Sequence, residues 1–86
     1  MKAINKAVDM VVLFDKNGVK PIRFKIINED EEEQVVKIKR VISKEKQKIA
    51  GVSYIIFNCV VELNEYEKNC EIRFNVMDMI WYVYKI

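Results

Sequence analysis

The side chains best suited to chemistry in this sequence are Cys59 and Cys70, in a chain that contains no histidine. A cysteine or serine nucleophile needs an adjacent base, usually histidine, so catalytic triads of this kind are excluded. Both cysteines fall on one side of an expected hairpin, where a redox pair would be geometrically feasible. Buried cysteine more often behaves as a small hydrophobic side chain, so we expect both thiols to fill the core.

Acidic side chains gather between Glu29 and Glu33, but this run lacks the alternating Asp/Asn ligands and the central glycine of a calcium loop. Two cysteines could complete a zinc site only across a dimer. With only two glycines, the chain offers no phosphate-binding loop and no dinucleotide fingerprint. We therefore expect no enzymatic activity, no cofactor and no metal.

Basic side chains form one pattern with a geometric consequence. Pairing of Ile27 with Val35 would put like charges side by side, with Lys25 opposite Lys37 and Arg23 opposite Lys39. Such pairs are unfavourable unless a polyanion neutralises them. Outward aromatic side chains could add stacking, as in sheet-based binders of single strands. The candidate nucleic-acid-binding residues are Arg23, Lys25, Lys37, Lys39 and Arg73.

Two observations weigh against that reading of the basic residues. The net charge is only +2 and the pI about 8.5, below the balance typical of a dedicated nucleic-acid binder. Lysine on edge strands is also a common protection against aggregation. Nucleic-acid binding is therefore the alternative function, behind protein interaction.

The composition favours strands to position these side chains. Twelve Val and twelve Ile stand against two Leu, and β-branched residues suit a pleated sheet better than a helix. The 86 residues suffice for one small domain, spanning 1–86.

The first hairpin is predicted at Asp15-Lys-Asn-Gly18, as a type I turn followed by a left-handed bulge residue. This three-residue loop places Met10 opposite Phe24 and Val12 opposite Ile22, which makes one face wholly apolar.

The segment 30–50 is open to two interpretations. Alternation favours a strand over 34–42, with Ser43 to Ile49 as a basic loop or short helical turn. The alternative is a helix within 30–50, with acids in its first turn, lysines in its last and Gly51 just beyond its end.

A hairpin is predicted over 52–76, with its turn around Glu65 and Tyr66. It places Cys59 opposite Ile72 and Phe57 opposite Phe74. A final aromatic strand follows, in which Tyr82 is expected to face the core. Several apolar side chains then point away from the core, and an exposed apolar patch usually marks an interface. The candidate interface residues are Leu13, Ile56, Val60, Trp81 and Val83.

Together these elements predict an all-β fold, a small antiparallel curled sheet or an SH3-like or OB-like barrel of about six strands. The α+β alternative follows from a helix within 30–50. No apolar run is long enough for a signal peptide or a membrane span, so we expect a cytoplasmic protein.

Several short fragments are distributed over nearly the whole chain: Lys20-Pro-Ile-Arg-Phe24, Ala50-Gly51, Cys59, Glu71-Ile-Arg-Phe74 and Trp81-Tyr-Val-Tyr-Lys-Ile86. Together they resemble a family of small uncharacterised proteins of about this length from low-GC Gram-positive bacteria. The resemblance implies a β fold and a bacterial cytoplasm, and it supplies no site. The expected function is a non-enzymatic interaction module that forms a homodimer or binds another protein.

Overall fold

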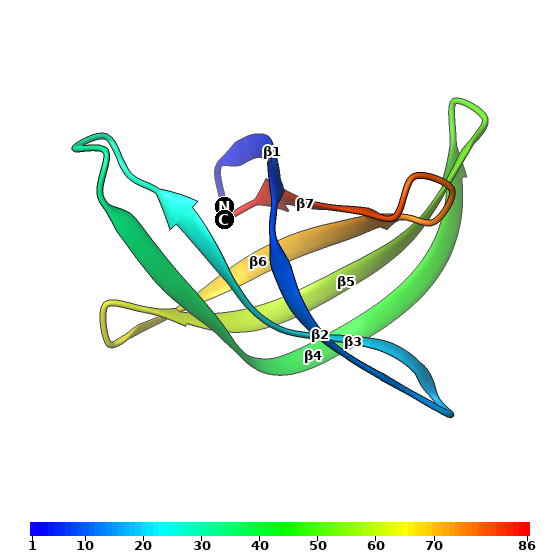
Figure 1. Cartoon of the computed structure of the whole chain (residues 1–86), viewed down its shortest axis with the longest axis horizontal. Coiled ribbons are helices and arrows are strands. Elements are labelled where there is room, and N and C mark those ends of the chain that lie inside the picture. The colour runs from blue at the N-terminus through cyan, green and yellow to red at the C-terminus, as the bar shows by residue number, and fades with distance from the viewer.

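A computed structural model describes all 86 residues and consists of strands joined by tight turns (Figure 1). The seven strands are β1 (Ala3–Val8), β2 (Met10–Asp15), β3 (Gly18–Ile27), β4 (Glu33–Ile49), β5 (Val52–Leu63), β6 (Tyr66–Asn75) and β7 (Ile80–Lys85). The all-β prediction is confirmed, and a helix within 30–50 is wrong. No helix of a length and apolarity that would span a membrane is present.

All seven strands belong to one antiparallel sheet, in the order β1-β7-β6-β5-β4-β3-β2, which curls strongly into a half-barrel (Figure 1). From β2 to β7 each strand pairs with the next along the chain. β1 instead pairs with β7, although only Asp9 separates β1 from β2. The first fifteen residues therefore supply both free edges of the sheet. The predicted fold of about six strands has one strand in this region, and the structure has two.

The β2–β3 hairpin follows the turn chemistry of its sequence. Asp15 Oδ1 accepts a hydrogen bond from the backbone N–H of Asn17 at 2.8 Å, and Gly18 has a φ of +105°. Asp15 pairs with Gly18, however, so the loop has two residues and the predicted three-residue loop is wrong; the extra residue on β3 is Ile22. Met10 pairs with Phe24 as predicted. Val12 pairs with Pro21 rather than Ile22, because the register shifts by one residue on β3.

Strand β4 continues to Ile49, so the basic loop predicted for 43–49 is wrong. Its distal half pairs residue by residue with β5, from Lys44 opposite Phe57 to Ile49 opposite Val52. The sequence Lys-Glu-Lys-Gln-Lys of 44–48 alternates in chemistry with the period of a strand. This pairing overrides the weak preference of a charged segment for a loop.

The β5–β6 hairpin turns at Asn64 and Glu65, which have φ values of +52° and +67°. Two positive φ values characterise a type I′ turn, whose twist matches the flanking strands. The register therefore differs by two residues from the predicted one, and Cys59 lies opposite Cys70. A shift of two keeps every side chain on its predicted face.

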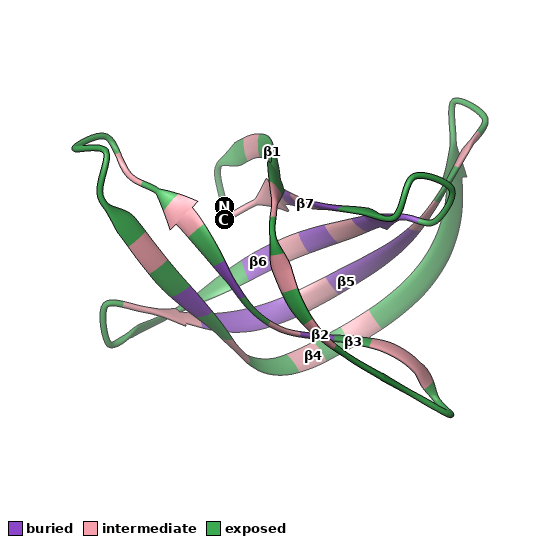
Figure 2. Ribbon diagram, in the orientation of Figure 1, coloured by how far each residue is buried: buried purple, intermediate pink, exposed green.

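Buried residues are concentrated on β5, β6 and β7 (Figure 2). Side chains from β3 to β7 form one cluster, which a curled sheet gathers on its concave side. Its eleven members are Phe24, Val36, Ile55, Phe57, Cys59, Val61, Cys70, Ile72, Phe74, Trp81 and Val83. The outward placement predicted for Trp81 and Val83 is wrong, and so is the core placement of Tyr82. The turn before β7 sets Trp81 opposite Phe74 and Tyr82 opposite Arg73, so the alternation of the last strand is reversed.

Candidate functional site

The two thiols are both free and both about 1% exposed. Burial raises the pKa of Cys59 to about 11 and, with a smaller contribution from the Cys59 charge, that of Cys70 to about 12. A thiol reacts as its thiolate, which these pKa values suppress at neutral pH. Both thiols belong to the hydrophobic core, where burial keeps them protonated.

The predicted basic patch does not assemble in the predicted register. Lys37 lies opposite Arg23, because Lys25 is opposite Val35. Lys25 Nζ lies 3.6 Å from the Glu33 carboxylate, and Lys39 Nζ lies 3.4 Å from that of Glu62. Neither predicted like-charge pair therefore forms, and the one like-charge pair between these strands is Arg23 opposite Lys37.

Arg73 lies apart from those cations, on β6. Its Nε donates to Glu71 Oε2 at 2.7 Å, and its guanidinium lies 3.4 Å from the centre of the Tyr84 ring. The guanidinium of Arg73 is thus held in place on the outer face of the sheet, and the Glu71 carboxylate neutralises its charge. Arg73 is thus separated from the other predicted nucleic-acid-binding residues.

Only one predicted interface residue is exposed, Leu13 at 49%. Trp81 and Val83 belong to the core. Ile56 and Val60 lie outside the core cluster, yet each is only 7% exposed. Their cross-strand neighbours are mostly long polar residues, Glu45 and Arg73 for Ile56, and Arg40 and Asn69 for Val60. The stems of such side chains cover apolar surface.

Strand β2 carries three of the exposed large apolar side chains. Val11 is 48% exposed, Leu13 49% and Phe14 79%. Because β2 ends the sheet order, its outer backbone edge pairs with no strand. This edge strand carries no charge from Met10 to Phe14.

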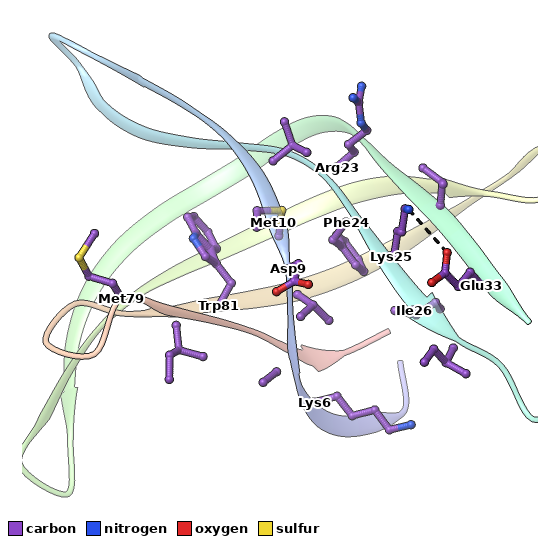
Figure 3. Close-up of a pocket in the computed structure, with 16 residues that line it drawn as sticks. Lys6, Asp9, Met10, Arg23, Phe24, Lys25, Ile26, Glu33, Met79 and Trp81 are labelled. Atoms are coloured by element: carbon purple, nitrogen blue, oxygen red, sulfur yellow. Dashed lines mark ion pairs between the residues drawn. The ribbon is translucent and has the colours of Figure 1, made fainter. Parts of the chain in front are cut away.

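A broad hollow of about 910 Å³ lies where β1 and β3 leave the half-barrel open (Figure 3). Trp81 and Phe24 flank Met10 in its floor, and charged side chains stand around it, among them Lys6, Asp9 and the Lys25–Glu33 ion pair.

The sequence interpretation missed three lysines on β4. Lys44, Lys46 and Lys48 share one face of the strand, and none forms an ion pair. Lys44 borders a second hollow of about 300 Å³ between the β2–β3 hairpin and β5. The period-two spacing of these lysines is visible in the sequence. It places them on one face only if the segment is a strand, and the prediction made 43–49 a loop or a short helical turn.

No cluster of three or more His, Cys, Asp or Glu side chains is arranged to hold a metal ion. Comparison with known proteins gives no match to a family model, to a curated protein or to a solved structure.

Proposed function

We propose that this protein is an interaction module that pairs with a second copy of itself along the free edge of β2. The observation that carries the proposal is an edge strand with five consecutive uncharged residues, Met10 to Phe14, and three exposed apolar side chains. An unprotected edge of this kind is a template for another strand.

The contrast between the two edges of the sheet supports this proposal. Strand β1 carries Lys6, and its pairing with β7 is interrupted between Ala3 and Lys6, where β1 has one extra residue. Asn5 in this bulge has a φ of +44°. Charges and bulges are the usual protection of an edge. On β2 the extra residue lies in the partner strand β3, so β2 itself stays regular.

A second copy is the occupant that fits this edge best. Two β2 strands can pair antiparallel about a two-fold axis, which brings the same apolar surface of both chains together. No like charges oppose each other within Met10–Phe14. One six-residue strand buries less than a standard interface, so the dimer is expected to be weak.

The double substitution Val11→Glu with Leu13→Glu tests the proposal. Val11 lies opposite Arg23 and Leu13 opposite Lys20, so each new carboxylate gains an opposite charge within its own chain. The same carboxylates would lie close together in the dimer. Light scattering at roughly 100 μM protein, suited to a weak dimer, should give twice 10.2 kDa for the parent chain and 10.2 kDa for the variant.

Val35→Glu is the matched control, because Val35 is 47% exposed and opposite Lys25, but on an interior strand. It should dimerise like the parent chain. A monomeric parent chain, or a double variant that still dimerises, would overturn the proposal.

A further inference from the structure

The distal half of β4 separates its charges by face. Lys44 lies opposite Phe57 and Lys46 opposite Ile55, and both partners belong to the concave core. Directly opposed residues share a face, so the lysines continue that concave surface beyond the core. Glu45 and Gln47 point to the other face, where Gln47 Nε2 donates to Glu45 Oε2 at 3.2 Å. The only acid of this segment is thus turned away from the lysines.

The resulting lysine row, Lys44, Lys46 and Lys48, is exposed (Figure 2) and lacks any ion pair. This contrasts with Lys25, Lys39, Arg40 and Arg73, which all have carboxylate partners. Residues two apart on a strand are roughly 6.6 Å apart, so three like charges follow one line. A line of charge suits an extended polyanion better than a single small anion.

Lys44, the first residue of the lysine row, lies close to an aromatic ring and to the β2–β3 hairpin. Lys44 Nζ is 5.7 Å from the centre of the Phe57 ring and reaches the β2–β3 hairpin, where it would lie 3.3 Å from a Cβ atom at Gly18. In that hairpin Phe14 lies opposite Val19, which packs against the core, so Phe14 is also on the concave face. Its ring is 79% exposed.

The two hairpins stand at the same end of the half-barrel. In Figure 1 the β2–β3 turn projects to the lower right and the β4–β5 turn to the upper right. The hollow of about 300 Å³ lies between the β2–β3 turn and the base of the β4–β5 hairpin, where Lys44 and Phe57 line it. Lys20 lines this hollow together with Lys44. A cationic track with an exposed aromatic ring beside it is the arrangement by which proteins hold single strands.

We propose that single-stranded nucleic acid binds along this lysine row, with its phosphates on Lys44, Lys46 and Lys48 and a base stacked on Phe14. The aromatic ring favours a nucleic acid over other polyanions, because a sulfated polysaccharide or a lipid headgroup has no base to stack. This site is separate from the outer-face residues Arg23, Lys25 and Lys37.

Fluorescence anisotropy with a labelled oligothymidylate of about twelve nucleotides tests the proposal, since single-strand sites span roughly 4–16 nucleotides. The variant Lys44→Gln/Lys46→Gln/Lys48→Gln should lower affinity about tenfold or more. Each phosphate contact on a single strand contributes roughly −0.7 to the slope of log K against log salt, so this slope should become shallower by about 2.

The control Arg23→Gln/Lys25→Gln/Lys37→Gln removes the same charge from the outer face of β3 and β4. It should keep the salt slope of the parent chain. Phe14→Leu, which preserves an apolar β2 edge, should weaken binding by roughly tenfold without changing the slope. Circular dichroism of each variant checks that the sheet is intact.

Three results would overturn the proposal. The first is an absence of binding by the parent chain at low salt. The second is an equal loss of affinity in the two charge variants, since binding would then depend on net charge alone. The third is binding to phosphatidylserine vesicles that depends on the lysine row, without binding to the oligonucleotide.

Discussion

The structure and the sequence-based prediction differ most clearly in the last strand. The structure buries Trp81 and turns Tyr82 outward, whereas the predicted alternation is the reverse. The Trp81 side chain is 7% exposed, and its ring centre lies 4.6 Å from that of Phe74 and 5.5 Å from that of Phe57. Tyr82, the next residue, faces outward opposite Arg73. Truncation of the two neighbours should therefore have unequal effects.

The expected cost of Trp81→Ala follows from its burial. Removing a buried Trp or Phe side chain from a core costs about 3–5 kcal/mol of unfolding free energy, including the cavity left behind. A chain of 86 residues is expected to have a total stability of roughly 4–13 kcal/mol. Tyr82→Ala removes a half-buried side chain and a cross-strand contact, which should cost roughly 1 kcal/mol.

Urea denaturation followed by circular dichroism measures both variants. With an m-value of about 1.5 kcal/mol/M, the Trp81→Ala midpoint should fall by about 2–3 M. The same experiment on the parent chain can use fluorescence, because Trp81 is the only tryptophan, and its emission should be blue-shifted when folded. A Tyr82→Ala variant less stable than Trp81→Ala would show that the alternation of β7 is the reverse of that described.

Two further predictions concern the thiols and the first turn. The folded thiols have pKa values of about 11 and 12, against a usual value of 9.0. Above pH 9 the thiols ionise in the unfolded chain but stay protonated in the folded one. The free energy of unfolding is therefore unchanged below pH 9 and should fall from pH 9 to 11, by about 1.4 kcal/mol per thiol for each pH unit. Urea titrations at pH 8, 9 and 10 should show this fall in the parent chain and not in Cys59→Ala/Cys70→Ala; parallel curves would contradict it. Gly18→Ala places a Cβ at a φ of +105° and 3.3 Å from Lys44 Nζ, so it should lower stability by about 1 kcal/mol or more in the same assay, whereas an unchanged midpoint would contradict it.

The sequence is most informative where alternation and turn chemistry agree. Asp15 and Gly18 specify the first hairpin, and the apolar face of β5 and β6 survives even a register error of two residues. Parity is a robust signal because a strand has only two faces. The class of fold and most of the core follow from it.

Register and the end of β4 are harder to predict, because both depend on contacts distant in sequence. The type I′ turn at Asn64 and Glu65 places two non-glycine residues at positive φ, which composition alone does not favour. The distal half of β4 is a strand because β5 pairs with it, and nothing within 43–49 requires one. Without this strand conformation, the sequence does not predict that Lys44, Lys46 and Lys48 share one face.

The two proposed surfaces are compatible in one assembly. When two edge strands pair antiparallel, the two-fold axis can stand perpendicular to the sheet, so both concave faces open to the same side. Strand β2 would then join two half-barrels, each with its lysine row on that common side. Pairing through β2 would thereby bring two weak cationic tracks within reach of one polyanion, and linked weak sites bind more tightly than either site alone. A single track of three lysines, in a chain whose net charge is +2, would thus gain affinity from dimerisation without any additional basic residue.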